Sequence, residues 1–298
     1  GAWDRVAYVE AMDKEGNWIE IIRYITPYGV ACSHEIDLTD YKSILQGKTK
    51  FRATCPTLDN GFLYDLTLEY RAGTPEYLYS QVTPVWDEIF PFGDYANLQP
   101  VPAASFMFPE NAEASTLKLV STGHGWGDLN TSNAAEFYEA THDIFVNGTA
   151  KFQQHNWQVC NPNPDGCQPQ NGTWYHNRSG WCPGSIAQFF DFSLDDMVNS
   201  GAITLGYTFF EGYVDLCHPN HPDCVTGVTC DDCEDGFNPT LDVACNLVVF
   251  SNTPLLPVGI KEPVAVTNNI NVFPNPSDGL FEIAVNTKAN LDDAEVII

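Results

Sequence analysis

Basic residues are scarce in this sequence. Its 298 residues include 13 Lys and Arg against 39 Asp and Glu, which gives a formal net charge of −26. A chain of this charge repels polyphosphate, so nucleic acid is excluded as a partner. Long apolar runs are also missing, since none approaches the roughly 18 residues that a membrane helix needs. We therefore expect no membrane span.

Apolar and aromatic residues are plentiful, at 44% and 13%, and they are enough for the cores of two domains. Strand patterns dominate: Val6–Met12 alternates, residues 13–17 have turn chemistry, and Trp18–Ile25 is a second apolar run, so a hairpin is predicted. Further strand-type runs cover residues 62–70, 202–210 and 246–250. Only residues 39–45 have the start, spacing and stop of a short helix. The pattern predicts an all-β fold.

Ten cysteines, an even number, favour an exported protein whose cysteines form disulfides. Five of them lie in 217–245, a stretch without periodic apolar residues, which we interpret as a stapled loop inserted between two strands. His218 and His221 in this loop offer a zinc alternative, and the acids that follow Cys230 a calcium one, but disulfides and a solvated acidic loop are favoured. We expect no metal and no cofactor.

Changes in composition suggest where the chain divides. Residues 84–109 are rich in Pro, Gly and aromatic residues and have little periodicity, which is typical of a crossing between domains. After Phe250 the chain becomes a Pro, Val and Thr linker. The division predicted from these changes is a first domain at 1–83, a second at 84–254 with its insertion at 217–245, a linker at 255–269 and a small unit at 270–298.

The tripeptide Trp3-Asp4-Arg5 sets an acid between an aromatic plate and a fixed guanidinium at the edge of a strand. Such a trio can recognise a polar, sugar-like ligand and tune a carboxylate. A surface ion pair beside a core tryptophan would have the same sequence. The tripeptide alone does not decide between a site and a surface pair.

Several motifs follow this tripeptide in a collinear series. The series resembles the bacterial peptide:N-glycosidase F family over roughly residues 3 to 254. The motifs that carry the resemblance are Trp3-Asp4-Arg5, Trp18-Ile19-Glu20-Ile21, Tyr24-Ile25-Thr26-Pro27-Tyr28-Gly29-Val30, Gly73-Thr74-Pro75-Glu76-Tyr77, Gly125-Trp126-Gly127, Ala135-Glu136-Phe137 and Arg178-Ser179-Gly180-Trp181-Cys182-Pro183-Gly184.

The resemblance implies two packed jelly-roll β-sandwiches with an active site in the cleft between them. It implies an amidase that needs no cofactor and releases N-glycans from N-glycosylated proteins or glycopeptides. The family's catalytic aspartate falls on Asp4, and Glu136 falls on a glutamate that assists by holding water and sugar. Residues that fall on family positions lining the cleft are Trp3, Arg5, Trp126, Arg178 and Trp181. The resemblance also implies a disulfide between Cys160 and Cys182.

Two departures from the family pattern define an alternative. Pro56-Thr57-Leu58 stands where the family has a Glu-Thr-Trp motif, so a sugar-contacting acid and a stacking tryptophan are absent. Ala134 and Tyr138 stand where the family has a further disulfide. The alternative is a non-catalytic surface protein that uses the same fold for glycan binding or assembly. The family also has strands before its Trp-Asp-Arg motif, so the first domain is expected to lack its start.

Residues 270–283 contain Phe273-Pro274-Asn275-Pro276 followed by Gly279-Leu280-Phe281. This segment resembles the start of the C-terminal sorting domain of cargo of the type IX secretion system of Bacteroidota, a short β domain that we expect to be truncated at Ile298. The resemblance implies the type IX secretion machinery as a partner. It also implies a secreted protein, or one on the cell surface of a Gram-negative bacterium.

Overall fold

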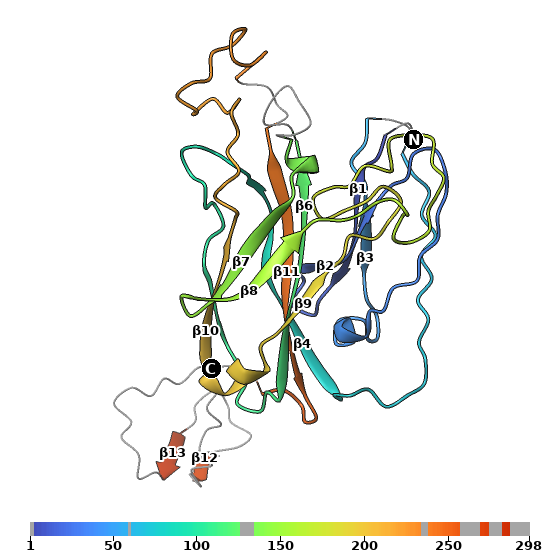
Figure 1. The fold of residues 1–298 in the computed structure, drawn as a ribbon. Helices are drawn as coiled ribbons and strands as arrows, with labels where there is room; N and C mark the ends of the chain where they lie inside the picture. The colour runs from blue at the N-terminus through green and yellow to red at the C-terminus, as the bar shows by residue number, and fades with distance from the viewer. Residues whose placement is uncertain are drawn as a thin grey trace. The chain divides into compact units, whose positions relative to one another are not determined.

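The structure is a computed structural model in which the chain divides into two compact units, Gly1–Leu256 and Pro257–Ile298 (Figure 1). It describes residues 3–58, 61–125, 134–233 and 238–256, together with strands β12 (Asn269–Phe273) and β13 (Glu282–Asn286). In the second unit these two strands pair antiparallel. Apart from Phe273, the residues that suggested a sorting domain lie outside the described ones, so that assignment stays a prediction.

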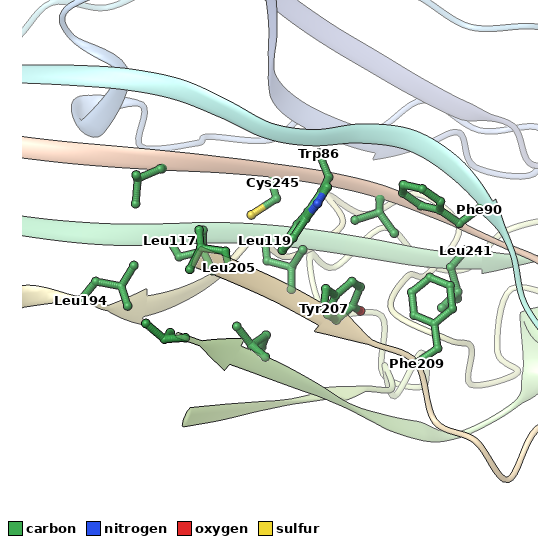
Figure 2. Packing of buried hydrophobic residues seen from close by; sticks show 14 of the residues in the cluster. Trp86, Phe90, Leu117, Leu119, Leu194, Leu205, Tyr207, Phe209, Leu241 and Cys245 are labelled. Atoms are coloured by element: carbon green, nitrogen blue, oxygen red, sulfur yellow. The ribbon is translucent and has the colours of Figure 1, made fainter. Parts of the chain in front are cut away.

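The first unit is built around a sandwich of two antiparallel sheets. One has the order β4 (Tyr79–Pro91), β11 (Thr240–Ser251), β6 (Ala114–His124), β9 (Phe190–Ser193), and the other the order β5 (Ala104–Met107), β10 (Ala202–Thr208), β7 (Ala140–Val146), β8 (Thr149–Asn156). Trp86, Phe90, Tyr207 and Phe209 fill the space between them (Figure 2). The all-β fold predicted from the sequence is confirmed.

A third sheet has the order β2 (Trp18–Ile25), β1 (Val6–Met12), β3 (Phe51–Thr54) and contains the predicted hairpin. Its apolar residues Val9, Ala11 and Ile21 pack with Val248 and Phe250 of β11. In Figure 1 it lies on one side of β6 and β11, and β7, β8 and β10 lie on the other. Strand β11 is therefore covered on both faces, and all its residues after Thr240 are buried.

The helices in the described part of the chain are short 3₁₀ turns: η1 (Thr39–Tyr41), η3 (Ala135–Phe137) and η4 (Asp195–Ser200). Helix η1 lies within the segment for which the sequence predicted a short helix. None of these turns has the length or apolar character that crossing a membrane demands. Strands therefore position the candidate site.

Two expectations from the sequence were wrong. Residues 62–70 alternate like a strand, but they form none, and Leu63 is fully exposed, because no neighbouring strand pairs with this segment. The cysteine-rich loop is shorter than expected, since β11 begins at Thr240 and takes Cys245 into the core as a free thiol (Figure 2). Four cysteines stay in the loop, paired as Cys217–Cys230 and Cys224–Cys233. The expected boundary at residue 84 falls inside β4 and stays a prediction.

Candidate active site

The Trp-Asp-Arg tripeptide lies just before β1, where two backbone contacts fix it to the end of β2. The amide of Arg5 donates to Oγ1 of Thr26 at 2.8 Å, and the amide of Thr26 donates to the carbonyl of Arg5 at 2.9 Å. Nη1 of Arg5 donates back to the carbonyl of Asp4 at 3.0 Å. Asp4 is thus held at the edge of the β2-β1-β3 sheet.

The loops after β6 and β8 bring Glu136 and Arg178 to each other. Glu136 lies in η3, and its carbonyl accepts from the amide of Ser179 at 2.9 Å. Arg178 pairs with Gln158 through backbone hydrogen bonds of 2.8 and 3.1 Å. Gly180 makes the turn possible, because its φ is +81° and a Cβ there would lie 2.2 Å from the carbonyl oxygen of Ser121. The local backbone therefore requires the glycine of the Arg-Ser-Gly-Trp motif.

Asp4, Glu136 and Arg178 form one ionic group, which we call the site cluster. Nε of Arg178 lies 3.0 Å from Oε1 of Glu136, and Nη2 lies 3.9 Å from Oδ2 of Asp4. The arginine side chain is 1% exposed, whereas those of Glu136 and Asp4 keep 21% and 17% exposure. Oδ2 of Asp4 is buried and has no hydrogen bond among the described residues. The arginine is thus closed in, while the side chains of both acids keep partial exposure.

Aromatic rings and carbonyl groups hold the Arg178 guanidinium in place. It lies over the rings of Trp181 and Phe137, at 4.8 and 5.3 Å from their centroids. Nη1 donates to the carbonyl of His176 at 2.7 Å, and Nη2 donates to the carbonyl of Thr173 at 3.1 Å. A guanidinium fixed on its faces and edges has one orientation in which to meet a carboxylate.

Burial governs the ionisation of both acids. Desolvation raises the pKa of Asp4, and the charges of Arg178 and Arg5 and the hydroxyl of Tyr28 offset part of this effect. Desolvation also raises the pKa of Glu136, against the charge of Arg178 and with a further rise from the negative charge of Asp4. Two carboxylates whose pKa values are raised toward neutrality around one cation can exchange protons with a reacting group.

The other predicted site residues differ in how exposed they are. Trp3 is 62% exposed beside Asp4 and can meet a ligand. Trp181 was expected on the cleft surface, but the structure buries it: it is 3% exposed, and its indole N–H donates to the carbonyl of Gly123 at 2.9 Å. Its ring supports Arg178 instead. Trp126 lies outside the described residues, so its place in the site stays a prediction. Leu58 is fully exposed.

Two disulfides hold the loops of this region. Cys160 and Cys182 are paired, which closes the loop that carries Arg178. Cys32 is paired with Cys167, a link the sequence did not indicate, because the two residues are 135 positions apart. This second disulfide joins the chain that follows Tyr28 to the loop between β8 and Arg178. Both cross-links restrain the backbone around the site cluster.

Tyr28 was not among the site residues predicted from the sequence, although it belongs to the Thr26-Pro27-Tyr28-Gly29 part of the resemblance. Nη2 of Arg178 donates to its hydroxyl at 3.5 Å, and that hydroxyl approaches the Asp4 carboxylate as a donor. Tyrosine is a common residue in protein cores, so its residue type alone did not identify Tyr28 as a site residue.

Within the described residues no three side chains of His, Cys, Asp or Glu come together as metal ligands. A cavity of about 340 Å³ lies near the opposite end of β6 and shares no residue with the site cluster. Its lining is acidic, with Asp37, Asp40, Glu76 and Asp195 beside Tyr77.

The chain is similar in sequence to known proteins. Residues 93–222 match the family profile "Peptide-N-glycosidase F, C terminal". The chain is 35% identical over 226 residues to peptide-N(4)-(N-acetyl-beta-D-glucosaminyl)asparagine amidase F of Elizabethkingia miricola, an alignment that covers 70% of this chain and 62% of that protein. The chain thus spans less than two thirds of this relative's length.

The fold is similar to those of solved structures. The structure of PNGase F, a glycosylasparaginase from Flavobacterium meningosepticum, superimposes with a TM-score of 0.67 at 26% identity, over 86% of this chain and 81% of that one. PNGF-II superimposes with a TM-score of 0.57 at 15% identity, over 85% and 55% of the two chains, and shows a shared fold alone.

Proposed function

We propose that the chain, whose residues 93–222 match the C-terminal profile of the peptide-N-glycosidase F family, hydrolyses the bond between glycan and asparagine in N-glycoproteins. The observation that carries the proposal is the site cluster: two partly exposed carboxylates, Asp4 and Glu136, share the fully buried Arg178. Amide hydrolysis needs a carboxylate that moves protons and a cation that stabilises an oxyanion.

Asp4 is the acid/base in this proposal. Its carboxylate takes a proton from water as the oxygen attacks the side-chain carbonyl carbon of the substrate asparagine. The proton then passes to the departing nitrogen as the C–N bond breaks. The products are aspartate in the polypeptide and a glycan that ends in a glycosylamine. The Asp4 side chain keeps 17% exposure, which gives water access to the carboxylate.

Arg178 and Glu136 assist. The guanidinium carries the positive charge nearest to Asp4, and its fixed plane stabilises the negative charge that develops on the carbonyl oxygen. Glu136 holds Arg178 by the 3.0 Å contact and, with its remaining oxygen, positions water and sugar hydroxyls. Trp3, which is exposed next to Asp4, supplies an apolar plate for a sugar ring.

We propose N-glycosylated proteins or glycopeptides as substrates and an extracellular or cell-surface location. Four disulfides within one chain are typical of an oxidising compartment. The type IX secretion machinery of a Gram-negative bacterium of the Bacteroidota remains the proposed partner for export, on the strength of the segment 270–283. Expression with and without residues 257–298, followed by detection in the medium, tests this part.

Mass spectrometry of a denatured N-glycoprotein incubated with the chain tests the activity. We expect intact glycan in solution and aspartate at the former glycosylation site. Asp4→Asn keeps the shape, removes proton transfer, and is expected to lower turnover by about 10²- to 10⁴-fold. Asp143→Asn is the matched control, because Asp143 lies on β7 and bonds Gln153. Undiminished release by Asp4→Asn would contradict the assignment.

A non-catalytic glycan-binding protein is the second candidate, and one observation favours it. Leu58, at the position where the resemblance expects a stacking tryptophan, is fully exposed and offers no aromatic face. The same experiment separates the candidates when binding is measured beside release. Retention of glycopeptide with no conversion of asparagine to aspartate by the wild type would favour the binding protein.

A further inference from the structure

The loop after β2 holds Tyr28 rigidly beside the site cluster. The side chain is 6% exposed. Its ring packs on the backbone of Gly172, where an added Cβ would lie 2.4 Å from two ring carbons. Its amide donates to Oε1 of Gln170 at 3.0 Å, and its carbonyl accepts from the amide of Asn171 at 3.1 Å. The hydroxyl therefore has a fixed position.

Two donors point at the Tyr28 oxygen. Nη2 of Arg178 lies 3.5 Å from it, and the side chain of Thr173 donates to it as well. Burial raises the pKa of Tyr28, so the hydroxyl keeps its proton at neutral pH. A hydroxyl whose oxygen accepts from two donors is a stronger donor of its own proton. The Asp4 carboxylate lies beside it, since the same Nη2 of Arg178 lies 3.9 Å from Oδ2 of Asp4.

We propose that Tyr28 is a positioning residue for Asp4: its hydroxyl aims the carboxylate at the reacting bond and favours its ionised form. The inference rests on the proposed function and deepens it. Besides the adjacent Arg5, both Arg178 and Tyr28 offset the effect of burial on the pKa of Asp4. Arg178 is shared with Glu136, whereas Tyr28 serves Asp4 alone of the two acids.

The cross-link beside Tyr28 fits this role. The disulfide Cys32–Cys167 joins the chain after Tyr28 to the loop that supplies Gln170, Gly172 and Thr173. A hydroxyl that must meet a carboxylate within a few tenths of an ångström gains from such a restraint.

Tyr28→Phe tests the proposal, because it removes the hydroxyl and keeps the ring on Gly172. We expect kcat for a glycopeptide to fall about tenfold with KM nearly unchanged. We also expect the acid limb of the pH–rate profile to move to higher pH, since ionised Asp4 loses a donor. Tyr24→Phe is the matched control: this tyrosine on β2 packs against His34 and does not touch Asp4, so neither quantity should change.

A direct titration of Asp4 by carboxyl carbon NMR separates this inference from the proposed function. Tyr28→Phe should raise the pKa of Asp4 above its wild-type value even if no glycopeptide is cleaved. Thr173→Val, which removes one donor to the Tyr28 oxygen and leaves the ring untouched, should shift it less in the same direction. An unchanged Asp4 titration in both variants, or a loss confined to KM, would overturn the role assigned to Tyr28.

Discussion

Two buried arginines in this molecule each face two carboxylates, and the two groups differ in how tightly they close. In the site cluster Arg178 lies 3.0 Å from Glu136 and 3.9 Å from Asp4. In a second group, the inner cluster, Arg23 lies 2.8 Å from Glu20 and 3.0 Å from Asp242. The charges are the same in kind, and one contact of the site cluster, that of Arg178 with Asp4, is longer than those of the inner cluster.

The inner cluster is saturated. Arg23 donates twice to Glu20 and once each to Thr122 and the carbonyl of Asp242, and the second oxygen of Asp242 accepts from Tyr8. The side chains of Glu20 and Asp242 are 3% and 8% exposed, so a ligand has no access to the inner cluster. The cluster instead holds the β2-β1-β3 sheet against β11. The site cluster leaves one Asp4 oxygen unbonded among the described residues. An acid oxygen left without a hydrogen bond, rather than the kind of charge, distinguishes the site cluster from the inner cluster.

The largest effect should follow from Arg178→Lys. A lysine keeps the charge but loses the planar contact with Trp181 and the fork that reaches both acids. We expect kcat/KM for glycopeptide hydrolysis to fall by about 10²- to 10³-fold. Lys118→Arg, at the exposed acids of Asp40 and Asp191, serves as the reverse control and should leave kinetics unchanged. Full activity in Arg178→Lys would show that charge alone suffices.

Arg23→Met should act on stability instead. It leaves Glu20 and Asp242 buried without their cation, which is expected to lower the free energy of unfolding by about 3–5 kcal/mol. Urea unfolding measures this loss, and the specific activity of the folded fraction should stay near that of wild type. Replacing Glu20 and Asp242 as well, by Leu and Asn, should recover much of the stability. A loss of kcat without a loss of stability would break the comparison.

Removal of the Cys160–Cys182 disulfide should cost about 3 kcal/mol in the chain-entropy model. The Cys217–Cys230 pair closes a shorter loop, with a sequence separation of 13 against 22, and because the cost varies with the logarithm of loop length its removal should cost only slightly less. Activity separates the two: replacement of Cys160 and Cys182 by Ser loosens the loop that carries Arg178 and should lower kcat, whereas the other replacement should not. Thermal unfolding and glycopeptide kinetics on both double variants give the answer.

The smallest effect is the pH dependence of stability that Glu20 contributes. Burial raises its pKa from 4.5 to about 7. A raised folded pKa means that the native state binds more protons than the unfolded state between these values. This contribution therefore falls as pH rises from 4.5 to 7, by up to about 1 kcal/mol per pH unit. Urea unfolding across this range should show a flatter slope in Glu20→Gln, and an equal slope would place the titration elsewhere.

Periodicity and turn chemistry predicted much of the fold. The hairpin of Val6–Met12 and Trp18–Ile25 could be predicted because one alternating pattern and one turn suffice for it. The sequence could not show that residues 62–70 lack a neighbouring strand, since pairing depends on distant parts of the chain. Cys245 was assigned to a loop because neighbouring cysteines suggested one, but packing in β11 decides its place.

For the site, the resemblance pointed to Asp4, Glu136 and Arg178, and the structure brings them together. Burial could not be predicted in the same way. Trp181 has the residue type of a sugar plate, yet its environment makes it a support for Arg178. Tyr28 has the residue type of a core aromatic, yet its hydroxyl faces Asp4. Residue type predicts what a side chain can do, and its neighbours decide what it does.

The double coverage of β11 has a consequence for how a glycoprotein would reach Asp4. Because β11 packs against sheets on both sides, swinging those layers apart would expose buried apolar residues such as Ile21 and Val248, at a cost that thermal motion does not supply. These layers are therefore not expected to open as a hinge. On the proposed function, the mobility needed for encounter comes from the substrate, so an asparagine in a flexible or unfolded stretch of polypeptide should be deglycosylated faster than one held on a rigid surface.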